Sequence, residues 1–135
     1  MKKLLLLLTA VFLLAGCQSQ PVTGETVTTG NGSYTSISPS ELSTMLEDKN
    51  FIFINVHISF AGNIPETDLS ISFDQIEQTL SQVPVDKDAK IVTYCRSGRM
   101  SQIAAVKLVS LGYINVWVLQ GGMDDWEQSG YPIEK

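Results

Sequence analysis

Three runs of β-forming residues, separated by segments with helical signals, constrain the fold more than any other feature of this sequence. The runs cover residues 51–56, 89–94 and 116–119. Continuous runs of this kind are typical of strands buried on both faces, as in parallel sheets. Strands that alternate with helices predict a single α/β domain, with a mostly parallel central sheet and helices on both of its faces.

Capping and stop residues place the helices between these strands. Ser38, followed by Pro39 and Glu41, has the pattern of a helix start. Ser72, with an acceptor side chain three residues later, predicts a second start. Glycine stop signals bound the remaining helices. The expected helices therefore follow Ser38, follow Ser72, cover residues 101–111 and lie around residues 124–128.

The N-terminal segment has the features of an export signal. Two lysines precede an apolar run over residues 4–14, which is too short to span a bilayer but suits a signal peptide. The run ends in Leu14-Ala15-Gly16-Cys17, which resembles the bacterial lipobox. That resemblance implies cleavage before Cys17 and attachment of a diacylglycerol to its sulfur. Residues 1–16 are thus predicted to be a lipoprotein signal peptide; a secretory signal with a chance cysteine is the alternative.

The residues after the predicted lipidation site are rich in Thr, Gly and Ser. Residues 17–34 show no sustained apolar period, and we expect them to form a flexible linker next to the lipid. Residues 35–135 remain for the folded domain. The expected location is the cell envelope, where the lipid on Cys17 anchors the chain outside the cytoplasmic membrane, on the periplasmic or extracellular side.

Composition excludes several classes of function. The formal net charge of −5 argues against a non-specific nucleic-acid binder, which needs a basic surface. Two cysteines and one histidine are too few for a typical structural zinc site of four ligands. We therefore expect no metal, no cofactor and no nucleic-acid partner.

Cys95 is the candidate nucleophile because it directly follows a predicted strand and directly precedes a helix. Ligands of parallel sheets bind beyond the carboxyl ends of the strands. Backbone N–H groups in such a turn and the following helix N-terminus favour a thiolate. Arg96 and Arg99 add positive charge that would attract an anionic substrate. The alternative is an inert cysteine buried in the core.

The spacing around Cys95 separates the possible cysteine chemistries. A cysteine phosphatase needs an arginine six residues after the cysteine, where this chain has Ser101. A thioredoxin-type pair needs a second cysteine where Gly98 stands. A cysteine protease pair would have to use His57, the one histidine, and nothing in the spacing supports this.

Several motifs together resemble the rhodanese (thiosulfate sulfurtransferase) family over about residues 36–135. They are the loop at residues 94–101, the Gly-Gly…Trp ending at 116–126, Gly130-Tyr131-Pro132, and a degraded Gly-His-Ile-Pro motif at 62–65. The resemblance implies a compact single rhodanese-like domain with a five-stranded, mostly parallel sheet. It also implies an enzyme that moves a sulfane sulfur from thiosulfate or a similar small anionic donor to a thiol or cyanide.

By position in the motif, the resemblance makes Cys95 the catalytic nucleophile that carries the sulfur as a persulfide. The implied substrate-binding residues are Arg96, Ser97, Gly98, Arg99, Met100 and Ser101. The oligomeric state is open, and a monomer is favoured.

Three positions depart from the family pattern. Asn55 and His57 stand where the family usually has Asp and Arg, and Asn63 stands where it has His. His57 is interpreted as structural rather than catalytic. These departures motivate an alternative function, a non-catalytic or sulfur-carrier module that binds a partner or an anion at the cell envelope. A third possibility is a redox role for Cys95, the one cysteine left after lipidation of Cys17.

Overall fold

The computed structural model describes Gly16 and residues 20–135, so the predicted lipidation site Cys17 and all of the predicted signal peptide except Gly16 lie outside the described residues. The strands are β1 (Glu25–Thr29), β2 (Gly32–Ile37), β3 (Ile52–Asn55), β4 (Leu69–Ser70), β5 (Ile91–Tyr94) and β6 (Val116–Leu119). The helices are α1 (Pro39–Glu47), the 3-10 helix η1 (Glu77–Gln82), α2 (Arg99–Ser110) and α3 (Gly122–Gln128). Among the described residues, no helix has the length and apolar character needed to cross a bilayer.

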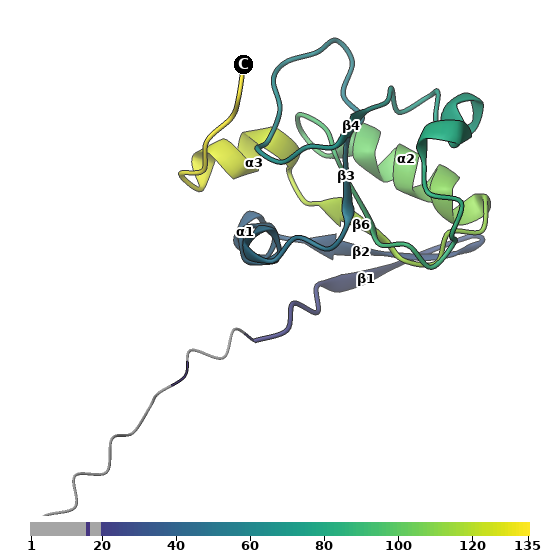
Figure 1. Cartoon of the computed structure of the whole chain (residues 1–135), viewed down its shortest axis with the longest axis horizontal. Coiled ribbons are helices and arrows are strands. Elements are labelled where there is room, and N and C mark those ends of the chain that lie inside the picture. The colour runs from purple at the N-terminus through teal and green to yellow at the C-terminus, as the bar shows by residue number, and fades with distance from the viewer. Residues whose placement is uncertain (1–15, 17–19) are drawn as a thin grey trace, which may run out of the picture.

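The six strands form one sheet in the order β1-β2-β6-β5-β3-β4 (Figure 1). β1 and β2 pair antiparallel, and every other neighbouring pair is parallel. The predicted α/β class with a mostly parallel sheet is confirmed, although the sheet has six strands rather than the five expected.

Two hydrophobic clusters cover the two faces of the sheet. One contains Leu108 and other side chains of α2, together with Ile76 and Cys95. The other contains Leu42 of α1 and Trp126 of α3. Helices therefore lie on both faces, and the cysteine belongs to the cluster of α2. The Cys95 side chain thus packs on the face of the sheet opposite to Leu42 of α1.

The predicted start of α1 is confirmed in atomic detail. The Ser38 hydroxyl accepts a hydrogen bond from the Glu41 amide at 3.3 Å, and the Glu41 carboxylate accepts one from the Ser38 amide at 2.8 Å. This reciprocal capping satisfies amides that the first helical turn leaves without partners. Pro39 at the first position needs no such partner.

The prediction of a regular helix directly after Ser72 is wrong. Residues 72–76 contain turns, and only η1 follows. The Ser72 hydroxyl donates to the Asp74 side chain. Thr79 has non-helical angles (φ −115°, ψ 22°), and its hydroxyl donates to the Gln75 carbonyl at 2.7 Å. Local side-chain bonds of this kind compete with regular helix formation.

The flexible linker expected over residues 17–34 is contradicted in its second half, where β1 and the first half of β2 form a hairpin. Val27 pairs with Tyr34 across the hairpin, and Ile37 of β2 pairs with Leu119 of β6. Val22 packs against the cluster of α1 and α3. The Thr and Val residues of this segment favour strands, and β6 supplies the neighbour that orders them.

Candidate active site around Cys95

Cys95 lies in the short loop between β5 and α2. Its sulfur accepts a hydrogen bond from the Gly98 amide at 3.0 Å and lies 3.6 Å from the Ser101 hydroxyl oxygen. The Ser101 hydroxyl in turn donates to the Gly98 carbonyl at 2.8 Å. Gly98 closes the loop with φ 106°, a conformation that favours glycine. The loop thus folds around the sulfur, and Cys95 is only 1% exposed.

The start of α3 is bonded to the backbone of this loop. The Met123 amide donates to the Cys95 carbonyl and the Asp124 amide to the Arg96 carbonyl, both at 2.9 Å. Gly122 is the point of closest approach, because a Cβ there would lie 2.3 Å from the Cys95 carbonyl oxygen. The Gly-Gly motif of the sequence therefore has a steric role, since it lets α3 contact the cysteine loop through backbone alone.

The two arginines of the loop do not act at one place. The Arg96 side chain is 64% exposed, and its Nε lies 3.6 Å from an Asp124 carboxylate oxygen. Arg96 also lines a cavity of about 200 Å³ with Glu127 and Lys135. Arg99 lines a separate depression on α2, beside Tyr34. The structure thus brings one arginine to the rim between the loop and α3, and places the other along α2.

The remaining predicted substrate-binding residues differ in exposure. Ser97 is exposed, whereas Gly98 and Ser101 are buried beside the sulfur. Met100 is half-buried and packs against the hydrophobic cluster of α2. Their contact with substrate stays a prediction.

A buried polar network connects Asn55 of β3 with Tyr94 of β5, the strand that precedes Cys95. The Asn55 amide group donates to the Gly62 carbonyl and to the Asn63 side-chain oxygen, both at 2.9 Å. The Tyr94 hydroxyl accepts from the Ile64 amide at 3.0 Å and lies 3.2 Å from the same Asn63 oxygen. Burial raises the pKa of Tyr94, partly offset by its hydrogen bonds, so the hydroxyl stays neutral and able to donate. The network ties loop 56–63 to the strand that precedes Cys95.

His57 takes part through its backbone rather than its ring. Its amide donates to the Asn55 side-chain oxygen at 3.0 Å. Its Nδ1 is buried without a hydrogen-bond partner among the described residues. Among the described residues, the hydrogen bonds of the Cys95 sulfur involve Gly98 and Ser101 and not His57, whose structural role stays a prediction.

Sequence reasoning treated Asn55 and Asn63 as separate departures, but they form one hydrogen-bonded pair. The family's Asp and His would allow a pair of reversed polarity, in which residue 55 accepts and residue 63 donates. Both positions depart from the family pattern, and this shared departure is the one sequence signal that could link them. The fold shows that the two side chains are in contact.

This pairing predicts strong coupling between the two positions. Asn55→Asp should lower the free energy of unfolding by about 2–3 kcal/mol, because the carboxylate faces the Gly62 and Asn63 oxygens without a proton to donate. Adding Asn63→His restores a donor and should recover about 1 kcal/mol or more of that loss. Urea denaturation of the two single variants and the double variant measures the coupling, and strictly additive losses would contradict it.

Residues 38–129 match the family model described as Rhodanese-like domain, which is more than half of the chain. The chain belongs to this family. The resemblance found in the sequence is thereby confirmed. Residues 1–18 match a second model, the prokaryotic membrane lipoprotein lipid attachment site.

Individual relatives of the rhodanese-like domain include named sulfurtransferases. It is similar to a sulfurtransferase of Allochromatium vinosum, with 39% identity over 72 residues that cover 53% of this chain and 64% of that protein. It is similar to the thiosulfate sulfurtransferase GlpE of Actinobacillus pleuropneumoniae, with 27% identity over 75% of this chain and 94% of the relative. It spans only 23% of the adenylyltransferase and sulfurtransferase UBA4 of Candida albicans, at 34% identity. The chain therefore spans less than two thirds of some of these relatives.

Solved structures support the same assignment. A rhodanese-like domain protein from Staphylococcus aureus is 28% identical, with a TM-score of 0.60 over 74% of this chain and 98% of that one. A rhodanese-related protein from Thermoplasma volcanium, 24% identical with a TM-score of 0.61 over 73% of this chain and 95% of that one, shares the fold.

Proposed function

We propose that this rhodanese-like domain is a sulfurtransferase that carries a sulfane sulfur as a persulfide on Cys95. The main support is the position of the Cys95 sulfur within its loop, where the sulfur accepts a hydrogen bond from the Gly98 amide at 3.0 Å. A donor aimed at sulfur stabilises a thiolate, which is the nucleophilic form of cysteine. The relatives named sulfurtransferases support the same chemistry.

The reaction proceeds in two successive nucleophilic displacements at sulfur. The Cys95 thiolate attacks the outer sulfur of thiosulfate, a sulfur–sulfur bond forms to Cys95, and the bond within thiosulfate breaks as sulfite leaves with the electron pair. Cyanide or a thiolate then attacks the outer sulfur of the persulfide. The product leaves with that sulfur, and the Cys95 thiolate is regenerated. The protein thus alternates between two covalent forms, as in ping-pong catalysis.

The near-complete burial of Cys95 favours small donors and acceptors. Only 1% of the residue is exposed, so a bulky reagent reaches the sulfur only if the loop moves. Arg96, at the exposed rim, is suited to orient the oxyanion group of thiosulfate, since guanidinium binds such anions through paired hydrogen bonds.

Mass spectrometry of the purified protein after incubation with thiosulfate tests the proposal. The wild type should gain ~32 Da, the mass of one sulfur, on the peptide that contains Cys95. Cyanide should remove the added mass and release thiocyanate. A wild-type protein that gains no mass under these conditions would exclude the persulfide intermediate.

Arg96 provides a prediction about donor binding. Arg96→Ala should raise KM for thiosulfate about tenfold, because a positive charge is lost at the rim. Asp124→Asn should lower KM, since it removes the carboxylate 3.6 Å from the guanidinium. Asp125→Asn is the matched control, because Asp125 forms no ion pair among residues 20–135, and its KM should match the wild type. Steady-state kinetics with thiosulfate as the varied substrate measures all three, and an unchanged KM in Arg96→Ala would remove the assigned role.

The second candidate function is a non-catalytic or carrier module at the cell envelope. The burial of Cys95 and the changed positions 55, 57 and 63 favour it. This candidate requires that Cys95→Ala retain binding of an anion or a protein partner, and that the wild type show no turnover.

The location of the domain is part of the proposal. Cleavage before Cys17 and lipid attachment to its sulfur would anchor the domain in the cell envelope, as the match to a lipid attachment site supports. Two acyl chains are sufficient for stable anchoring.

A further inference from the structure

The folded domain begins only a few residues after the proposed lipid-bearing cysteine. Val22 already packs against the hydrophobic cluster of α1 and α3. Four residues separate Val22 from Cys17. A fully extended chain spans at most about 3.6 Å per residue, so these two residues are never more than about 18 Å apart, whatever conformation lies between them. The long linker expected from composition is thus reduced to a short strap.

The surface beside this strap is formed by α1. Residues 20–23 and α1 together line a groove of about 480 Å³, which includes Ser40, Glu41 and Glu47. Figure 1 shows α1 next to the point where the N-terminal segment leaves the domain. Among the described helices, α1 is thus the one that lines this groove with residues 20–23.

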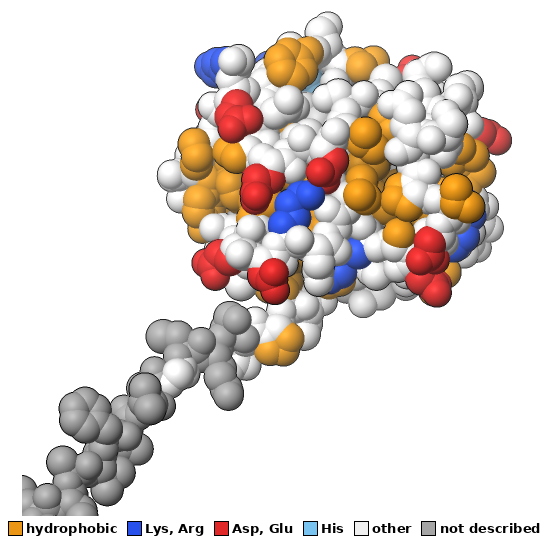
Figure 2. Space-filling model, viewed as in Figure 1, with side chains coloured by type: hydrophobic (Ala, Val, Ile, Leu, Met, Phe, Trp, Pro, Cys, Tyr) orange, Lys and Arg blue, Asp and Glu red, His pale blue; other side chains and the backbone are white. Residues whose placement is uncertain are grey.

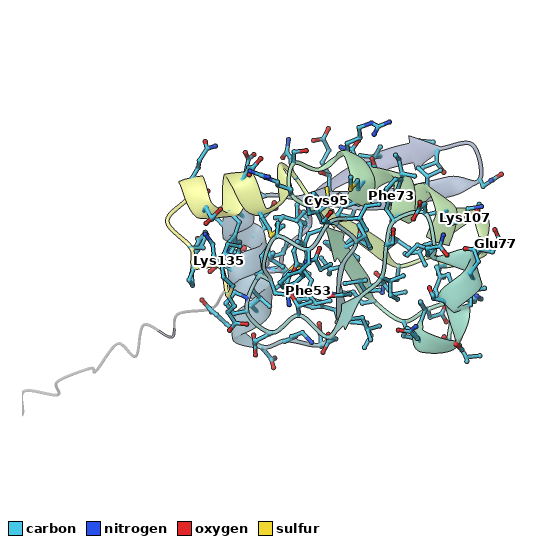
Figure 3. All side chains as sticks on the ribbon, turned by 90° about the horizontal axis from the view of Figure 1, so that it is seen from above. Phe53, Phe73, Glu77, Cys95, Lys107 and Lys135 are labelled. Carbon is cyan, nitrogen blue, oxygen red and sulfur yellow. The ribbon has the colours of Figure 1, made fainter. Side chains whose placement is uncertain are left out.

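Cys95 lies across the sheet from that surface. Its side chain belongs to the cluster of α2, whereas Val22 belongs to the cluster of α1 and α3 on the other face. β1, the first strand after the strap, is separated from β5 by β2 and β6. In Figure 3, Cys95 lies well inside the outline of the domain.

We propose that the domain sits directly on the lipid bilayer, with its α1 side facing the headgroups and the Cys95 loop turned toward the aqueous phase. This inference rests on the lipid attachment proposed for Cys17. The orientation follows from the shortness of the strap and not from attraction between charges. Residues 4–48 contain no lysine, arginine or histidine that could bind acidic headgroups, and the exposed side chains there include Glu25 and Glu47. Figure 2 shows acidic and basic side chains mixed on the displayed face of the domain, so no single sign of charge marks it. The sulfur donor and acceptor are accordingly water-soluble molecules rather than lipids.

Energy transfer from the domain to a labelled bilayer tests this orientation. The full-length lipoprotein, in a Cys95→Ser background, receives a donor dye at Ser40→Cys on α1 or at Ser97→Cys on the active-site loop. It is then reconstituted into phosphatidylcholine vesicles that carry an acceptor on their headgroups. Transfer from position 40 should exceed transfer from position 97 at least about twofold, because the strap keeps Val22 within about 18 Å of Cys17.

A spacer variant is the control. Inserting about twenty Gly and Ser residues between Ser19 and Gln20 adds a flexible chain with a typical end-to-end distance of about 25 Å, which should remove the difference between the two positions. Equal transfer from both positions with the native strap, stronger transfer from position 97, or a protein without lipid on Cys17 would each overturn the proposal. None of these readouts depends on sulfur transfer, so the orientation and the catalytic function fail independently.

Discussion

Replacing Cys95 with serine is expected to lower the rate of sulfur transfer at least about 1000-fold while the fold is retained. The serine oxygen cannot form the sulfur–sulfur bond on which both of the proposed displacements depend. Serine is close to cysteine in volume, and its oxygen can accept the hydrogen bond that the Gly98 amide now donates to sulfur. The free energy of unfolding should therefore change by less than about 1 kcal/mol. Thiocyanate production from thiosulfate and cyanide measures the first effect, and urea denaturation the second.

Ser101→Ala separates loss of the sulfur from general damage to the site. The Ser101 hydroxyl lies 3.6 Å from the Cys95 sulfur and donates to the Gly98 carbonyl, so its removal disturbs the same loop but leaves the nucleophile. This variant should still gain ~32 Da from thiosulfate, at a reduced rate, because the Cys95 sulfur remains. If wild type and Cys95→Ser were equally inactive, the binding-module function would replace the enzymatic one.

The fold was predictable where local pattern and final environment agree. The run 116–119 is apolar in sequence and became β6 with the expected bounds, and Ser38 had its capping partner three residues away. The hairpin of β1 and β2 was missed because the segment is rich in Thr, Gly and Ser, which suits both a linker and an exposed hairpin. Its order comes from pairing with β6, which lies about eighty residues further along the chain.

In the site, too, some features follow from neighbouring residues in the sequence, and others depend on contacts between segments far apart in the chain. The place of Cys95 between strand and helix follows from its neighbours in sequence. The different directions of Arg96 and Arg99 do not, because they depend on where α2 begins and on Asp124 of α3. The bond between Asn55 and Asn63 was equally hidden, since a loop of seven residues brings them together. The sequence thus predicts the position of Cys95 in its loop, whereas packing determines what surrounds it.

Gly122→Ala is expected to damage both stability and activity. A Cβ at this position would lie 2.3 Å from the Cys95 carbonyl oxygen and 2.7 Å from that of Arg96, which is closer than real Cβ contacts. Both oxygens are backbone atoms, and both also accept hydrogen bonds from the first turn of α3, so neither moves alone. Its φ of 59° adds strain for alanine. We expect a loss of about 3 kcal/mol in the free energy of unfolding and at least about a tenfold loss of turnover.

Gly130→Ala isolates the steric part of this effect. Gly130 also has a positive φ, 90°, but a Cβ there would have no neighbour within 4 Å. It should cost only about 1 kcal/mol, from backbone strain alone, and leave turnover unchanged. Urea denaturation and thiocyanate production compare the two variants. The extra loss of stability and turnover in Gly122→Ala would come from pushing α3 away from the cysteine loop. Equal losses in the two variants would show that this contact does not hold the sulfur in place.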